Sequence, residues 1–418
     1  MLWVTTGFPP EISGPAVGNH DRARWFAAHG SFRVVVLAPL WPGTASTPAT
    51  AEYPEVVRYP AKPWPPYRNF RVPTLAGARM VESQVRRLRP AVVLLTDIER
   101  SFLFASWRLP GRRWARRNGV PYLGYYHTDF YNFAGMYPVW RHLRDVLIRP
   151  ALRRLYGSLD AAVCPSPSAA RQADFLGARR SYALRFDGVD TDQFGPDRRD
   201  RQFLARLLGT DGSGPVVLSL GRLAWEKRVD LIIDAVGRLQ RRPELADVRL
   251  VIAGAGADEV VAGLRRTAAG IPRPDRVHLV GPVTGTDKAT LMASCDALCL
   301  ASPYETFGIT VTEAMASGLP VVASRSGALP DLLSHGRNSY LHVPEDAGSI
   351  ADTLAEALTT DRTPVVAQAL EDVQHFSMHR VGADLDGFLT EIVRTRRLPD
   401  SQLEFTHGKS TVDAKGRE

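Results

Sequence analysis

The sequence has little cysteine and no long apolar run. Its 418 residues include three cysteines, Cys164, Cys295 and Cys299, and none has the neighbouring Cys or His residues that a zinc site requires. We therefore expect buried free thiols in a reducing, cytosolic compartment. No uncharged apolar run approaches the roughly 20 residues that span a bilayer, and residues 1–6 are typical of a strand rather than of a signal peptide.

Negative charge is scarce in the first half of the chain. The net charge is +8, but residues 1–190 hold 26 Lys or Arg against 13 Asp or Glu, whereas residues 191–418 hold 26 against 31. This excess indicates an anionic partner (phosphate, a membrane surface or nucleic acid), unless it reflects only a general enrichment in arginine. A nucleic-acid-binding protein without enzymatic activity is disfavoured, because no basic groove rich in aromatic residues and no known binding module occurs.

Short apolar runs alternate with amphipathic segments along most of the chain. The predicted strands are 2–6, 32–37, 91–95, 122–126, 160–164, 216–220, 249–253, 277–280, 296–300 and 320–323. The predicted helices are 18–29, 75–89, 102–117, 139–155, 167–177, 198–208, 229–240, 257–268, 286–294, 308–317, 347–358 and 378–394. Such alternation predicts an α/β fold with two doubly wound, Rossmann-like domains.

We expect the first domain to cover residues 1–188 and the second to cover 189–378, with a ligand site in the cleft between them. Residues 41–73 are rich in proline and aromatic residues and are interpreted as an irregular excursion near the cleft mouth. The polar residues 396–418 lack periodicity and are predicted to be disordered.

Residues 302–322 combine the end of a strand, the start of a helix and two carboxylates. The helix is expected to begin near Gly308 and to end at Gly318. The first turn of a helix has unpaired N–H groups that attract phosphate. Glu305 and Glu313 lie on either side of this start, and their carboxylates suit neutral hydroxyl groups, as on a sugar or a ribose. The stretch therefore predicts a nucleotide-sugar site.

Two cations and a histidine follow other predicted strands. Arg222 and Lys227 can converge at a loop-to-helix turn, where they would hold a pyrophosphate and stabilise a leaving diphosphate without a metal. His127 lies just past strand 122–126, where ligands of open α/β sheets bind. The alternatives are a solvated basic loop for Arg222 and Lys227 and a structural role for His127. A binding site is favoured because all these residues are expected at one cleft.

Residues 139–155 form a basic amphipathic helix that we expect to break at Pro150. Its apolar residues Leu143, Val146, Leu147 and Leu155 are expected to face the core. Its arginines would then face either anionic lipid or solvent.

These motifs resemble the retaining glycosyltransferases of family 4, which have the GT-B fold. The matching segments are 221–227, 304–322, 8–14, 188–194, 254–256 and 281–283. The resemblance extends to about residue 395. It implies that the first domain binds the acceptor, that the second binds the nucleotide sugar, and that helix 379–395 crosses back onto the first domain.

The resemblance also implies roles for individual residues. The catalytic residues would be His127, Arg222, Lys227 and Glu305, with Glu305 on the hydroxyls of the donor sugar. The donor-binding residues would be Gly14, Gly221, Gly254, Val283, Thr306, Phe307, Gly308, Ile309 and Glu313, with Glu313 on the ribose hydroxyls. Asp129 and Tyr131 would lie on the acceptor side, because residues 126–130 resemble members that glycosylate lipids.

The implied reaction moves a hexose from a nucleotide-diphosphate sugar to an acceptor hydroxyl of a lipid or a secondary metabolite, with the leaving diphosphate taking the proton. No metal or other cofactor is expected. A lipid acceptor would add an anionic membrane surface as a partner and place the protein on the cytoplasmic side of the inner membrane. A sucrose- or trehalose-type synthase with a soluble sugar acceptor and a sugar-nucleotide epimerase are the alternatives. The sugar and base of the donor are not indicated.

Three positions depart from the usual pattern of that family. Asp187 stands where an Asn is common, Ser13 precedes Gly14 where two glycines are common, and Ala328 follows Gly327 in place of a second glycine.

Overall fold

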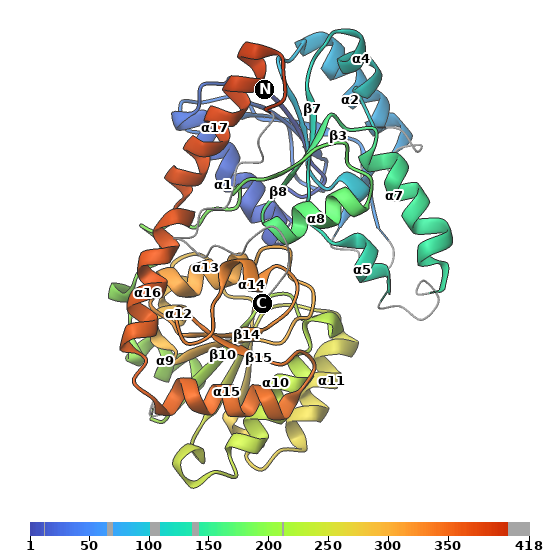
Figure 1. Ribbon diagram of the computed structural model, residues 1–418. Helices are drawn as coiled ribbons and strands as arrows, with labels where there is room; N and C mark the ends of the chain where they lie inside the picture. Colours follow the sequence, from blue (N-terminus) through green and yellow to red (C-terminus); the bar gives the residue numbers. More distant parts are fainter. Residues whose placement is uncertain (12, 65–69, 101–108, 136–141, 211–212, 400–418) are drawn as a thin grey trace, which may run out of the picture.

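Two α/β lobes, stacked one above the other, form the molecule (Figure 1). The computed structural model describes residues 1–11, 13–64, 70–100, 109–135, 142–210 and 213–399. The predicted fold class is confirmed: both lobes contain a parallel sheet with a hydrophobic cluster of buried residues on each of its faces.

Within the described residues, the first sheet has the strand order β3-β2-β1-β6-β7-β8-β9 and the second the order β12-β11-β10-β13-β14-β15. The strands of the first lobe are β1 (Leu2–Val4), β2 (Val35–Pro39), β3 (Glu55–Tyr59), β6 (Val93–Leu95), β7 (Tyr122–Tyr125), β8 (Ala161–Cys164) and β9 (Ser181–Ala183), with a hairpin of β4 (Ala61–Pro63) and β5 (Arg71–Pro73). Those of the second are β10 (Val216–Leu220), β11 (Arg249–Ala253), β12 (Val277–Gly281), β13 (Ala297–Leu300), β14 (Val321–Ser324) and β15 (Tyr340–His342).

The strand order reverses between β1 and β6 and again between β10 and β13. In open α/β sheets, ligands bind outside the carboxyl ends of the strands at such a switch point. The loops after these four strands are therefore where a site is expected.

Helices connect the strands. They are α1 (Gly14–His29), α2 (Leu75–Leu88), α4 (Arg112–Arg117), α5 (Phe130–Gly135), α7 (Arg149–Tyr156), α8 (Pro167–Phe175), α9 (Arg201–Leu208), α10 (Val229–Leu239), α11 (Asp258–Ala269), α12 (Gly285–Ser294), α13 (Ile309–Ala316), α14 (Leu329–Leu332), α15 (Ala347–Thr359), α16 (Thr363–Val373) and α17 (Met378–Thr395). Short turns of 3-10 helix include η3 (Trp225–Lys227), and η1 (Arg144–Ile148) is a π-helix.

Helix α1 begins earlier than the predicted residue 18. The Ser13 side chain accepts a hydrogen bond of 3.2 Å from the Ala16 N–H, and Pro15 lies in the first turn. A capping serine followed by an early proline is a helix start, so the helix begins at Gly14.

The prediction of an irregular excursion over 41–73 is wrong for its second half. β3 joins the edge of the first sheet, and β4 pairs with β5. Residues 55–59 lie between two prolines and include Glu55 and Arg58, so this short strand has no continuous apolar run in the sequence.

The prediction that Leu143, Val146 and Leu147 face the core is also wrong: they are 38%, 69% and 54% exposed. Arg149 N–H bonds to the carbonyl of Arg144, five residues back, so this turn is a π-helix and its side chains rotate away from the α-helical register. Leu155 is buried as predicted. Parts of three predictions lie outside the described residues: 102–108, 139–141 and 400–418.

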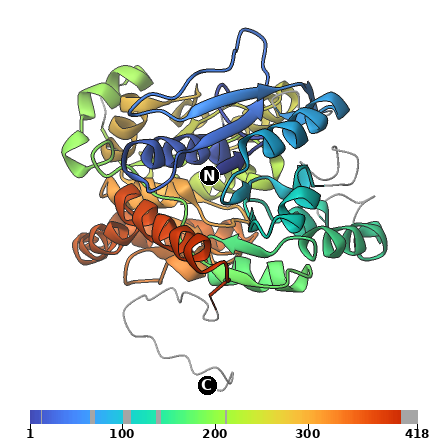
Figure 2. The same ribbon diagram turned by 90° about the horizontal axis from the view of Figure 1, so that it is seen from above.

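Helix α17 runs back along the first lobe (Figures 1 and 2). A Cβ on Gly382 would come within 2.3 Å of the Trp25 ring of α1. Leu385, Phe388 and Leu389 belong to a buried cluster of the first lobe. The last helix thus completes the core of the lobe in which the chain begins.

The three cysteines are buried free thiols, which confirms that prediction. Across the part of the chain that the structure describes, no helix is both long and apolar enough to cross a membrane.

Candidate functional site

Helix α13 begins at a glycine in a left-handed conformation. Gly308 has φ 95°, and a Cβ there would lie 3.1 Å from the Leu329 side chain. A glycine is required by both constraints. The Phe307 side chain, just before this glycine, lies buried at 4% exposure.

Glu305, in the loop before this helix, pairs with Lys227. Lys227 Nζ lies 2.5 Å from Glu305 Oε1, with the two side chains 27% and 15% exposed. The two residues come from loops after β10 and β13, on either side of the switch point. The structure therefore brings together two of the predicted catalytic residues.

Glu313 pairs with a lysine that the sequence did not single out. Lys288 Nζ, from α12, lies 2.6 Å from Glu313 Oε1, while Oε2 has no hydrogen-bond partner. Burial raises the pKa of Glu313, and the Lys288 ammonium opposes this shift. The carboxylate is held in place on one side and has a free acceptor atom on the other, as a pair of ribose hydroxyls would require.

Arg222 bonds to Glu226, four residues on, rather than to either predicted acid. Glu226 is buried at 6% exposure, and its second carboxyl oxygen has no partner. Arg222 and Lys227 thus lie in the same short segment after β10, and each pairs with a different glutamate.

Close backbone approach explains the predicted glycines of the second lobe. A Cβ on Gly254 would lie 1.8 Å from the Gly221 carbonyl oxygen, and the Gly254 N–H donates to the Gly281 carbonyl at 2.8 Å. These glycines pack the carboxyl ends of β10, β11 and β12 together. Val283 follows β12 and packs against the core of this lobe.

Gly327 packs directly against the backbone of Glu305. It has φ 61°, and a Cβ there would lie 2.7 Å from the Glu305 carbonyl oxygen. The next residue, Ala328, donates its N–H to that oxygen at 2.8 Å. Ala328 is one of the departures noted above, and its methyl group does not prevent this contact.

His127 lies past the end of β7, buried at 9% exposure, and its Nε2 has no hydrogen-bond partner. Burial lowers the pKa of His127 to about 4, although Asp187 opposes the shift. The imidazole is therefore neutral near pH 7. Asp187, another departure, pairs with Arg22 of α1 and so has a specific partner.

The two lobes meet at these residues. Thr306 Oγ1 donates to the His127 carbonyl oxygen at 2.8 Å. A Cβ on Gly14 would come within 3.8 Å of the Ile309 side chain. Predicted residues of both domains therefore line one junction.

A buried charged cluster in the first lobe was not predicted. Asp97 accepts hydrogen bonds from the Gly7 N–H at 2.9 Å and from Arg100 at 2.7 Å. Arg100 also lies 3.7 Å from Glu11. Burial raises the pKa of Glu11 to about 7, and Arg100 opposes this shift. These contacts hold Gly7 and Glu11, in the loop between β1 and α1, against the residues that follow β6.

The predicted acceptor-side residues have local partners. Asp129 accepts from the Asn132 N–H at 3.1 Å, and the Tyr131 hydroxyl donates to Asp145. The first contact holds the start of α5, and the second joins α5 to η1.

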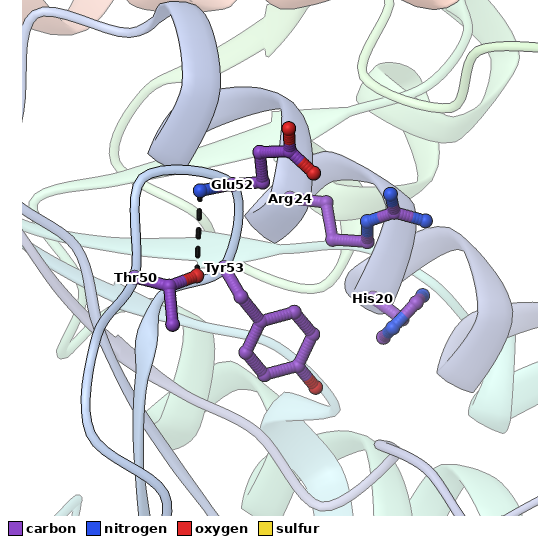
Figure 3. Close-up of a pocket in the computed structure, with 5 residues that line it drawn as sticks. All are labelled: His20, Arg24, Thr50, Glu52 and Tyr53. Carbon is purple, nitrogen blue, oxygen red and sulfur yellow. Dashed lines mark hydrogen bonds between the residues drawn. The ribbon is translucent and has the colours of Figure 1, made fainter.

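A shallow cavity of about 350 Å³ lies outside these contacts, on the first lobe (Figure 3). His20 and Arg24 of α1 face Thr50, Glu52 and Tyr53, which precede β3. None of these five residues was predicted as a site residue.

Two family descriptions match the chain. Residues 12–193 match the glycosyltransferases of family 4, and residues 200–369 match the glycosyl transferases of group 1.

Curated relatives include a GDP-mannose-dependent alpha-mannosyltransferase of Mycobacterium tuberculosis, 30% identical over 94% of this chain and 97% of that protein. A GDP-mannose-dependent alpha-(1-6)-phosphatidylinositol dimannoside mannosyltransferase of that species is 28% identical over 83% of this chain and 85% of its own. The sulfoquinovosyl transferase SQD2 of Arabidopsis thaliana is 28% identical over 68% of this chain, which spans about half (52%) of its length.

Among solved structures, Anabaena Alr3699/HepE in complex with UDP and glucose has a TM-score of 0.71 and 19% identity, over 94% of this chain and all (100%) of that one. The sucrose-phosphate synthase of Thermosynechococcus elongatus has a TM-score of 0.74 and 17% identity, over 94% and 99%. Both likenesses concern the fold, which is GT-B.

Proposed function

Because the chain belongs to the group 1 and family 4 glycosyltransferases, which use nucleotide-sugar donors, we propose that it transfers a hexose to a hydroxyl of a membrane lipid with retention. The observation that carries the donor half is the pairing of Lys227 with Glu305 beside the start of α13. The pair sets a cation and an acid at one switch point, where a diphosphate and a sugar would lie side by side.

In this proposal, the bound diphosphate replaces Glu305 as the partner of the Lys227 ammonium. Lys227 and Arg222 hold its oxygens and stabilise the charge that builds up as the bond to the sugar breaks. Glu305 then turns to the sugar hydroxyls, and Glu313, positioned by Lys288, accepts from the ribose. The leaving diphosphate takes the acceptor proton on the same face of the sugar.

His127 acts by hydrogen bonding and not by charge. Its lowered pKa of about 4 keeps it neutral at pH 7, so its free Nε2 accepts or donates one bond to a sugar hydroxyl without ion pairing. The bond between Thr306 and the His127 carbonyl keeps this ring beside the donor side.

The lipid half rests on the surface around η1. Val146 and Leu147 are exposed there next to exposed Arg153 and Arg154 of α7. Apolar side chains flanked by arginines suit the boundary between headgroups and acyl chains of an anionic membrane. This surface would hold the protein against the cytoplasmic face of the membrane, with the cleft close to its lipid acceptor.

The test is nucleoside diphosphate release by the full chain from UDP-, GDP- and ADP-hexoses. Each donor is supplied with vesicles containing phosphatidylinositol or diacylglycerol, or with soluble sugars. We expect release with one base, and only with vesicles. Release with soluble sugars alone would overturn the lipid half, and no release from any donor would overturn the whole proposal.

Flotation with anionic vesicles tests the surface separately. The variant Val146→Asp/Leu147→Asp should lose flotation, whereas Val343→Asp, at a residue 59% exposed on the second lobe, should keep it. Equal flotation of all three proteins would contradict the assignment of this surface.

A further inference from the structure

A second cavity, of about 810 Å³, lies at the end of the first lobe farthest from the cleft. We call it the arginine groove. Its lining residues come from α4, from the segments before β7, β8 and β9, and from the end of α17: Arg112, Ala115, Arg116, Gly119, Val120, Pro121, Asp160, Arg179, Arg180, Glu391, Ile392, Thr395, Arg396, Arg397, Leu398 and Pro399.

The groove is distant from the predicted site. It opens beside Pro121, before β7 begins, whereas His127 follows the other end of that strand. Six residues of extended chain separate them, or about 20 Å at roughly 3.3 Å per residue. A ligand in the groove would therefore not occupy the cleft.

The groove carries an excess of positive charge. Six arginines line it against two acids, and both acids already have partners. Asp160 receives two hydrogen bonds from Arg112, at 2.6 and 3.0 Å, and Glu391 receives three from Arg394. Within the described residues, the guanidinium groups of Arg116, Arg179, Arg396 and Arg397 have neither a hydrogen bond nor an ion pair.

Its walls are held in place. Arg180 donates to the carbonyl oxygens of Leu398 and Pro399 at 3.0 and 3.1 Å, and the Tyr182 hydroxyl donates to Pro399 at 2.6 Å. These bonds tie the chain after α17 to the edge strand β9. Arg396 has φ 55°, a left-handed conformation that costs a non-glycine residue energy.

We propose that the arginine groove is a binding site for a phosphate-bearing ligand, separate from the donor cleft. Guanidinium groups bind phosphate oxygens in pairs, and four of those that line the groove have no carboxylate partner among the described residues. The volume is that of a small-molecule site, large enough for a phosphate with an attached organic group. A lipid headgroup and a free phosphate compound share this chemistry.

Two probes separate these sources: inorganic pyrophosphate, followed by calorimetry, and phosphatidylglycerol vesicles, followed by flotation against phosphatidylcholine. The groove variant is Arg116→Ser/Arg396→Ser. The cleft variant is Lys227→Ala. The control variant is Arg265→Ser/Arg266→Ser, which removes the same charge from exposed positions of α11.

We expect wild type to bind pyrophosphate at two sites, and each of the first two variants to lose one of them. Loss of two charge-assisted contacts should weaken the groove site at least about tenfold, with donor turnover unchanged within about twofold. Weakened vesicle binding in the groove variant would identify a lipid headgroup as the ligand. If only pyrophosphate binding is weakened, the ligand is a free phosphate compound. The proposal is overturned if the groove variant binds both probes like wild type, if the control loses as much, or if wild type binds neither probe.

Discussion

Replacing Lys227 by methionine removes one charge from the site and keeps most of the side-chain volume. If Lys227 holds the leaving diphosphate, it contributes more in the transition state than in the ground state. Loss of one such donor costs about 10²–10³ in kcat, or about 3–4 kcal/mol of barrier. The loss of folding stability should be far smaller, about 1 kcal/mol, because both members of the pair with Glu305 are partly exposed.

The neighbouring Arg228 provides a matched control. Its guanidinium lies 3.2 Å from Asp230 and 2.7 Å from Glu345, and its side chain is 24% exposed, close to the 27% of Lys227. Arg228→Met should therefore cost similar stability and leave kcat unchanged. Nucleoside diphosphate release at saturating donor measures both variants. Equal kcat values for Lys227→Met and Arg228→Met would refute the role of Lys227.

Two further predictions concern the support of the site and the buried carboxyl groups. Gly327→Ala places a methyl group 2.7 Å from the Glu305 carbonyl oxygen at φ 61°, so kcat should fall about tenfold or more with a stability loss of about 1–2 kcal/mol. Gly336→Ala, at φ 73° with open space around the new methyl, should lose stability alone; equal kcat in the two variants would contradict this account. Glu99 is buried beside Tyr156, and burial raises the pKa of Glu99 from 4.5 to about 7. The folded state thus binds its proton more tightly than the unfolded state does, so this contribution to stability is full below pH 4.5 and is lost as the pH rises through 7. Glu99→Gln mimics the protonated form, so the difference in unfolding free energy between it and wild type should change by about 3 kcal/mol between pH 4.5 and pH 8. A constant difference in denaturant titrations would show that the Glu99 carboxyl does not titrate with this shift.

Local patterns in the sequence account for most strands of both sheets, whereas β3, β9 and β15 were not predicted. A run such as Leu250–Ala253 is buried on both faces, and glycines such as Gly254 follow where backbones approach closely. The segment 55–59 gave no such signal because an edge strand is only half buried. Val146 and Leu147 were assigned to the core because their spacing suits an α-helix, and a π-turn changes that register without a clear mark in the sequence.

In the candidate site too, some residues could be predicted from the sequence and others only from the structure. Glu305, Glu313 and Lys227 stand in motifs with characteristic spacing, so the sequence alone singles them out. Their partners do not: Lys288 meets Glu313 from another helix, and Gly327 meets Glu305 from the loop after β14. Glu11 and Arg100 come together only because β1 and β6 are neighbours in the sheet. Contacts of this kind follow from strand order, which a local pattern does not contain.

The configuration of the product tests the central claim most directly. The purified protein is supplied with the α-linked nucleotide sugar that supports turnover and with its acceptor, and the configuration of the new glycosidic bond is determined by NMR. Transfer in which the diphosphate takes the acceptor proton on the same face predicts an α-linked product. A β-linked product would contradict both the mechanism and the roles given to Lys227 and Glu305.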